Sequence, residues 1–533
     1  IELVKSLHQE KILQLNERHQ WVWDIELVES TIATENVIDL MIRRIERLPY
    51  DCQHMLHVAA CVGSTIELKL LKQLMSLETP VFESTVQRLV KDEFVFIENN
   101  QSTEMLTSIK FSHDKIQQSA YQLALAIPKS QIHFKAANYY LTLVNNKLQN
   151  IDIFEYIEHI NLSSELFIDI NQQELLIEKN FIAGQKALES NAYIAAISYF
   201  DQALDYFQEN PWQTNHQQCY DIYTAKAKSF YLCQEYQQCD EVFVLLMANV
   251  KNLEEELACC KTQILSLIAQ NNMQAAFTLG ISVLEQADIK LPLEDNPNDY
   301  QKSLEKHYQN KHIDDLISLP QMTDKTQLLS LDILNTIQTP AYLTGPIEFM
   351  KVAFISLELC FSSGLSAVSS KVFVTYGLLL CGAFNQYQRG LQFANLAIKI
   401  SQKYPQPYTR IEVNFTFNAS VLHWSSHIKS TLKPLQQNFY QGIESGNVEY
   451  AFHSILIYCL HNLFSGTSLK KADKDFEQYT QLMMNKKQYY QLGVAQPWYQ
   501  LLLKMRHPSA EPSLLTGQAF DCDTTLPQLL ATN

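Results

Sequence analysis

The side chains best suited to chemistry lie in residues 111–121, where His113 and Asp114 stand between a predicted hairpin and a predicted helix. Ser112 has the side chain of an N-cap, which places His113 in the first helical turn. The unpaired backbone N–H groups of such a turn bind phosphate oxygens well, and the helix dipole disfavours an imidazolium ion there. A neutral His113 that donates a hydrogen bond to a phosphate fits this position. The alternative is that His113 and Asp114 only tie the helix to the hairpin.

Two pairs of histidines have a spacing that a metal ion could use. His423 and His427 are one helical turn apart, and His54 and His57 lie close together in an earlier stretch. A metal site needs at least three protein ligands, and no third ligand is evident near either pair. Trp424, which follows His423, is predicted to be a core residue. The sequence therefore predicts no metal site.

The motifs of known catalytic chemistry are missing from the chain. Residues 184–186 (GQK) lack both the upstream glycine and the following serine or threonine of a phosphate-binding P-loop. The metalloprotease motif HExxH, the hydrolase motif GxSxG and the kinase motif DFG do not occur either. No nucleophile has a base at a recognisable spacing. We therefore predict that this segment is not an enzyme by itself, with no catalytic residue and no cofactor bound by the segment alone.

The composition narrows the class of protein. The chain has 47% hydrophobic and 18% charged residues, which suits a packed core and argues against wholesale disorder. Its net charge of −16 makes unaided binding to nucleic acid or to an anionic membrane unfavourable. The 11 cysteines are scattered without CxxC pairs, as in reduced cytosolic proteins. No apolar run reaches the ~18 residues of a transmembrane helix, so we expect a cytoplasmic chain without membrane insertion. Its start at Ile1 suggests a piece of something longer.

Hydrophobic periodicity predicts the elements that would position His113. Several short helices are followed by two strands that turn at residues 99–100, and a further helix starts after His113. The predicted helices are residues 36–45, 51–63, 66–77 and 81–90, and the predicted strands are residues 94–97 and 107–111. This is the order of a winged-helix unit. In its fourth helix Arg88 and Lys91 are balanced by acidic neighbours such as Asp92, so no concentrated basic face is available for DNA.

Beyond residue 132 almost every stretch is typical of paired helices. A turn with small and aromatic neighbours recurs before Tyr193, Tyr236 and Gln274, at steps of 43 and 38 residues. A period of about 40 exceeds the ~34 residues of a standard tetratricopeptide repeat, which indicates a degenerate array with longer helices. Such arrays present a concave face to partners, so we expect protein partners to bind the helical array.

The predicted fold is mainly α, an α-α superhelix of tetratricopeptide-like helix pairs preceded by a small winged-helix-like α+β unit. Polar residues punctuated by prolines interrupt the array at 291–325, and the tail after residue 507 lacks periodicity. The predicted domains are a leading segment at 1–35, the winged-helix-like unit at 36–125, a first helical array at 126–290, a linker or irregular segment at 291–325, a second array at 326–506 and a linker at 507–533.

Several segments, taken in order, resemble large bacterial multi-domain signalling ATPases. The likeness covers most of residues 20–530. The segments that carry it are 36–41 (NVIDLM), 48–49 (LP), 59–63 (AACVG), 111–121 (FSHDKIQQSAY), 183–187 (AGQKA), 192–193 (AY), Trp424 and 515–520 (LTGQAF). In that family a serine/threonine-kinase-like domain precedes an ATPase of the STAND class. A long tetratricopeptide-like region follows, and often a GAF sensor and a histidine kinase.

The resemblance implies that this chain is the middle of such a protein. Residues 36–125 would end the ATPase module, and residues 507–533 would lead into a missing downstream domain. The chain lacks a Walker loop, a kinase catalytic loop and the phosphoacceptor-histidine helix. ATP or ADP would therefore bind the missing ATPase core, and the parent chain would be an ATP-binding protein kinase.

The resemblance also implies a role for the histidine and aspartate at the hairpin-to-helix junction. In STAND ATPases the winged-helix unit commonly carries a His-Asp pair that touches the nucleotide phosphate. By that analogy His113 senses the phosphate and Asp114 fixes its orientation.

The favoured function is a regulatory, protein-interaction segment that couples nucleotide state and partner binding to a downstream kinase output, with the adjacent ATPase and kinase domains as further partners. One alternative is a winged-helix transcription regulator with a helical ligand-sensing array. The other is a free-standing tetratricopeptide-type scaffold.

Overall fold

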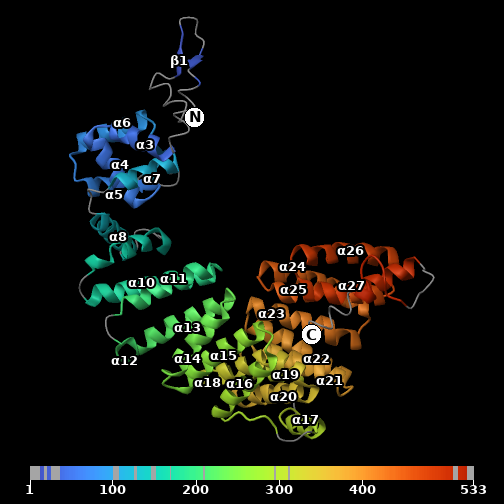
Figure 1. Cartoon of the computed structure of the whole chain (residues 1–533). Coiled ribbons are helices and arrows are strands. Elements are labelled where there is room, and N and C mark those ends of the chain that lie inside the picture. The colour runs from blue at the N-terminus through green and yellow to red at the C-terminus, as the bar shows by residue number, and fades with distance from the viewer. Residues whose placement is uncertain are drawn as a thin grey trace. The chain divides into compact units, whose positions relative to one another are not determined.

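The computed structural model shows two compact units, Ile1–Cys233 and Gln234–Asn533 (Figure 1). The described residues are 13–16, 21–23, 25, 37–99, 107–124, 129–145, 152–167, 170–207, 210–292, 296–309, 312–507 and 514–524. Among them, no helix is both long and apolar enough to cross a membrane. Most of the predicted leading segment and of the predicted C-terminal linker lies outside the described residues. The described part of the leading segment holds a short antiparallel pair, β1 (Leu13–Leu15) and β2 (Trp21–Trp23).

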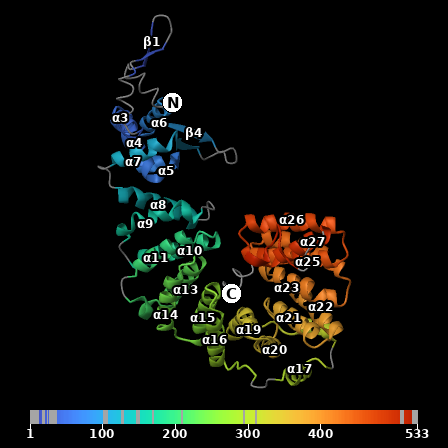
Figure 2. The ribbon, with the colours of Figure 1, turned by 45° about the vertical axis from the view of Figure 1, so that its right-hand side comes forward.

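The first unit then forms a small α+β unit in which helices pack against a three-stranded sheet (Figure 2). Its elements are α3 (Val37–Glu46), α4 (Tyr50–Val62), β3 (Thr65–Glu67), α5 (Leu68–Met75), α6 (Thr79–Lys91), β4 (Val95–Asn99), β5 (Thr107–Phe111) and α7 (Asp114–Leu123). Apolar side chains at helical spacing meet in one core, where Ile45, Leu56, Leu71 and Leu89 are fully buried. The mainly helical class and the small α+β unit before the array are both as predicted.

The hairpin predicted before His113 is confirmed. Strands β4 and β5 pair antiparallel, with Val95 opposite Phe111 and Ile97 opposite Ile109. The sheet order is β3-β5-β4, because β3 pairs with the other edge of β5 and places Ile66 opposite Ile109. The hydrophobic periodicity predicts instead that a helix starts at Ile66. A strand of three residues is too short to show a period of two, so only its pairing with β5 reveals it.

The rest of the first unit is helical. Its elements are α8 (Lys129–Asn145), η2 (Ile153–Glu155), α9 (Ile157–Asn161), η3 (Ser164–Leu166), α10 (Ile170–Glu189), α11 (Tyr193–Asp205), α12 (Pro211–Thr214) and α13 (His216–Leu232). Helix α8 contacts α4 and α5 on one side and α9 on the other, so it joins the α+β unit to the helices that follow. Helices α10 and α11 pack closely, since Gly184 of α10 lies against the ring of the fully buried Phe200.

The second unit is built from further helices. They are α14 (Tyr236–Met247), α15 (Leu253–Ala269), α16 (Met273–Gln286), α17 (Pro297–Glu305), η4 (Ile313–Ser318), α18 (Lys325–Thr336), α19 (Gln338–Thr344), α20 (Pro346–Ser363), α21 (Ser369–Gly382), α22 (Tyr387–Lys403), α23 (Pro407–Thr416), η5 (Phe417–Val421), η6 (Leu422–Trp424), η7 (Ile428–Thr431), α24 (Leu432–Glu444), α25 (Val448–Phe464), α26 (Leu469–Asn485) and α27 (Tyr489–Arg506). Their largest core gathers fully buried aromatic rings, including those of Phe373, Tyr376 and Phe393.

The segment predicted to be a linker or irregular, residues 291–325, contains α17 and η4. Its side chains belong to the core of the second unit: Leu304 and Tyr308 are 2% exposed, and Tyr300 stacks on Phe354 with ring centroids 5.5 Å apart. One of the prolines predicted to interrupt the array, Pro297, lies in the first turn of α17, after the N-cap Asn296. Proline at that position starts a helix rather than ending one.

Six turns between helices share one backbone feature. In each, the residue two positions before the next helix has a left-handed conformation, with φ between 55° and 77°. These residues are Asn191, Gln234, Asn271, Asn385, Gly446 and Lys487, which precede α11, α14, α16, α22, α25 and α27. At the first of them the N–H of Ala192 donates to the carbonyl of Ala187 at 2.8 Å, the bond of a Schellman motif. The turns before α11, α14 and α16 are those that the sequence predicts, and they are confirmed.

Candidate functional site

The loop between β5 and α7 is anchored by Ser112, which does not cap the helix as predicted. Its hydroxyl donates to the carbonyls of Glu93 at 2.6 Å and Phe94 at 3.1 Å, next to strand β4. The N-cap is His113, one residue later, with an extended backbone. Because the serine hydroxyl is used to hold the loop to the sheet, the next side chain caps the helix.

His113 caps α7 through its ring. Its Nδ1 atom accepts a hydrogen bond from the backbone N–H of Lys115, with 3.1 Å between the two nitrogens. An accepting nitrogen carries no proton, so a neutral His113 bears its proton on Nε2. The side chain is exposed at the positive end of the helix dipole. His113 can therefore donate Nε2–H to an anion at this helix end.

Asp114, the first residue of α7, is also exposed but has different surroundings. The hydrogen bond that orients His113 comes from Lys115 rather than from Asp114. Asp114 lines a cleft, whereas His113 is not among the residues that line it. The two predicted site residues, His113 and Asp114, are therefore neighbours at the start of α7, but only Asp114 lines the cleft.

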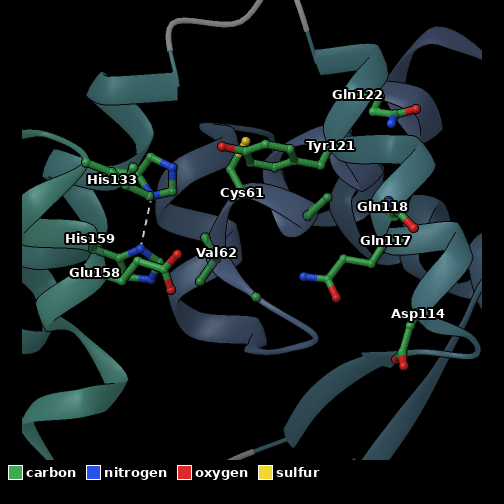
Figure 3. A pocket seen from close by; sticks show the side chains of 13 residues that line it. Cys61, Val62, Asp114, Gln117, Gln118, Tyr121, Gln122, His133, Glu158 and His159 are labelled. Carbon is green, nitrogen blue, oxygen red and sulfur yellow. Dashed lines mark hydrogen bonds between the residues drawn. The ribbon is translucent and has the colours of Figure 1, made fainter. Parts of the chain in front are cut away.

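The cleft beside α7 has a volume of about 500 Å³ (Figure 3). One wall is the C-terminal end of α4 with Gly63, a second is α7, and the others are residues of α8 and α9. Its polar lining includes Asp114, Gln117, Tyr121, His133, Glu158 and His159. The cleft thus lies at the junction between the α+β unit and the first helices of the array.

Two buried histidines meet on one side of this cleft. His133 of α8 and His159 of α9 are 3% and 6% exposed, and their Nδ1 atoms lie 2.9 Å apart. Burial lowers the pKa of both imidazoles. The pKa of His159 falls to about 4, with the adjacent His133 as a second cause. Both rings are therefore neutral at pH 7, and one Nδ1–H donates to the other Nδ1.

Reasoning from the sequence missed this histidine pair. The two residues are 26 positions apart, and their spacing matches no ligand or catalytic pattern. Ile132 and Phe134 flank His133, and Ile160 follows His159, which predicts burial of each histidine on its own. Nothing local indicates that the two rings face each other, because that depends on how α8 packs against α9.

Neither of the histidine pairs with a metal-like spacing, His423 with His427 and His54 with His57, lines this cleft. His427 caps η7, since its Nδ1 accepts from the backbone N–H of Lys429 at 3.1 Å. His423 packs instead against the ring of His461, with centroids 5.5 Å apart. Over the described ranges, no three histidine, cysteine, aspartate or glutamate side chains are placed to hold a metal ion.

The prediction that Trp424 is a core residue is wrong. Its side chain is 46% exposed, stacks on Tyr387 and donates from Nε1 to the carbonyl of Ser420 at 3.1 Å. It follows the π-helical turn η5 and ends the 3₁₀ turn η6. A π turn adds a residue to the helical repeat, so the apolar face expected from a period of 3.6 residues is rotated away at this point.

Comparisons with known proteins give one similar curated sequence. No protein-family model matches the chain. The chain is 22% identical over 574 aligned positions to hybrid signal transduction histidine kinase G of Dictyostelium discoideum. That alignment covers 92% of this chain and 16% of the kinase, so the chain spans about a sixth of the length of this relative.

Among solved structures, the chain matches a Signal Transduction ATPase with Numerous Domains (STAND) protein with a tetratricopeptide repeat sensor, from Pyrococcus horikoshii. The TM-score is 0.46 at 10% identity, over 100% of this chain and 73% of that one. The curated relative is not bacterial, so the likeness is not confined to bacterial proteins. The chain is thus similar, over nearly its whole length, to part of a signalling histidine kinase.

Proposed function

We propose that this chain is a regulatory segment of a signal-transduction protein, which couples nucleotide state and partner binding to a kinase output in the same protein. The observation that carries the proposal is the similarity to a hybrid signal transduction histidine kinase over 92% of the chain. The helix pairs supply surfaces for protein partners. ATP binding and phosphotransfer belong, in this proposal, to neighbouring ATPase and kinase domains, and this segment itself is not an enzyme.

Within this proposal the α+β unit is a winged helix at the end of an ATPase module. Helices α4, α5 and α6, followed by the β4–β5 hairpin and joined by β3 at the other edge of β5, support that assignment. The alternative of a DNA reader is less well supported. On α6, the Arg88 guanidinium lies 3.7 Å from the Asp92 carboxylate, which neutralises a charge that DNA phosphates would need.

His113 is, in this proposal, the residue that senses the nucleotide phosphate. Its support is the cap bond from Lys115, which leaves an exposed Nε2–H donor at the positive end of α7. A donor that contacts nucleotide in one state of the protein and not in the other shifts the balance between the two states.

The test measures ADP release and kinase autophosphorylation of the full-length protein that carries this chain. His113→Asp keeps a good N-cap but replaces the donor with a negative charge, while His113→Asn keeps both a cap and a short N–H donor. We expect ADP to dissociate roughly fivefold faster from His113→Asp, with His113→Asn in between and the melting temperature little changed in both. ADP release and autophosphorylation equal to wild type in both variants would contradict the sensor role.

A further inference from the structure

The buried histidine pair has two neutral arrangements of protons, because either Nδ1 can donate to the other. In one of them the Nδ1–H of His133 donates to the Nδ1 of His159, and His159 carries its own proton on Nε2.

In this arrangement the Nε2 atom of His133 carries no proton and presents a lone pair. This nitrogen is buried and has no hydrogen-bond partner in the structure. His133 lines the cleft, and Figure 3 shows its second ring nitrogen on the side that faces Tyr121. A buried acceptor without a donor is costly, so a ligand N–H that reached it would remove that cost.

The other groups around the cleft favour a positive charge. The carboxylates of Asp114 and Glu158 are both exposed in its wall, and no lysine or arginine is among the residues that line it. The last carbonyls of α4 add the negative end of one helix dipole, and the start of α7 at Asp114 adds the positive end of another, so the helix ends do not decide the sign. One positive group opposes this: the ammonium of Lys129 donates from Nζ to the Tyr121 carbonyl at 2.9 Å, and its charge adds to burial in lowering the pKa of His133. Two carboxylates against this one ammonium leave the surroundings of the cleft net negative.

From these contacts we propose that the cleft binds a small organic cation with N–H donors, an alkylammonium or a guanidinium ion. One N–H of the cation donates to Nε2 of His133, and its charge is balanced by Asp114 and Glu158. The ligand touches both α7 and α9, so it ties the α+β unit to the first helices of the array. This site does not use His113 and does not rest on the proposed nucleotide-sensing function.

The test is calorimetric titration of the chain with methylguanidine and with butylamine. Tetramethylammonium is the matched probe, because it carries the same charge and has no N–H donor. We expect both donor cations to bind at least about threefold more tightly than tetramethylammonium, the ratio expected for one added hydrogen bond. Nitrogen NMR of labelled histidine should show the resonance of the unprotonated His133 Nε2 move when methylguanidine is added.

Substitutions then distinguish binding at this cleft from nonspecific attraction of cations to a negatively charged protein. Glu158→Gln removes an exposed lining carboxylate and should weaken methylguanidine binding about threefold. Glu155→Gln makes the same change of charge at an exposed position outside the lining and should leave binding unchanged. His133→Phe should abolish the preference for donor cations. Equal binding of the three cations, equal effects of the two glutamate variants, or no binding at all would each overturn the proposal.

Discussion

The burial of a neutral histidine couples the stability of this fold to pH. The pKa of His159 falls to about 4 in the folded protein, whereas an unfolded histidine titrates near 6.5. Between these two values the unfolded chain binds a proton that the folded chain does not. Stability therefore falls as the pH drops through this window and is unaffected above it. We expect a loss of roughly 3 kcal/mol from His159 near pH 4, measured by urea unfolding at that pH and at neutral pH.

Two variants test the source of this acid sensitivity. His159→Phe removes the titrating group and should make the fall in unfolding free energy between neutral and acid pH shallower. His312→Gln replaces an exposed histidine and should leave the pH dependence as it is. The coupling to His159 is wrong if the phenylalanine variant loses as much stability on acidification as the wild-type chain does.

At the scale of single residues, the sequence predicts what depends on near neighbours. The position of His113 at the start of a helix follows from local patterns, and the error of one residue in the cap arises because Ser112 bonds carbonyls about twenty positions earlier. The contact between His133 and His159 depends on the packing of two helices. No pattern around either residue carries that information, so the cleft could not be predicted.

Among the secondary-structure elements, the close packing of α10 on α11 depends on Gly184. A Cβ added there would overlap the ring of Phe200, which is fully buried and cannot move aside. Alanine gains about 1 kcal/mol of helix propensity over glycine, but overpacking costs about 1–3 kcal/mol. We expect Gly184→Ala to lower the free energy of unfolding by roughly 1 kcal/mol in chemical denaturation.

The control is a helical glycine with open space around it. Gly382, at the end of α21, has nothing within 4 Å of an added Cβ. Gly382→Ala should therefore be neutral or slightly stabilising. A stability loss of the same size in both variants would mean that the cost does not come from the contact with Phe200.

Hydrophobic periodicity predicts the long helices well but does not predict short strands or irregular helical turns. The sequence predicts the bounds of the long helices α4 and α6 to within a few residues, because apolar positions recur over several turns of each. The strand β3 is too short to show a period, and the π turn η5 changes the period itself. The sequence predicts breaks at the prolines around α17, but Pro297 starts that helix.

The molecule as a whole has two units, and each has hydrophobic cores of its own. Phe200 belongs to a core of the first unit and Phe393 to the largest core of the second, and both are fully buried. Replacing a buried phenylalanine by alanine costs about 3–5 kcal/mol. We expect Phe200→Ala and Phe393→Ala to lower different calorimetric transitions, one for each unit. A single transition that both variants shift equally would contradict independent unfolding.

The six left-handed turns also indicate how much sequence change the turns of this chain tolerate. Five of them use asparagine, glutamine or lysine rather than glycine, although a left-handed conformation costs such residues roughly 1 kcal/mol. The packing of the flanking helices outweighs that cost, so the shape of each turn does not require one residue type. Mutations can then accumulate at the turns while the helices keep their places. A helical array of this kind can therefore keep its architecture while the sequence of its turns changes.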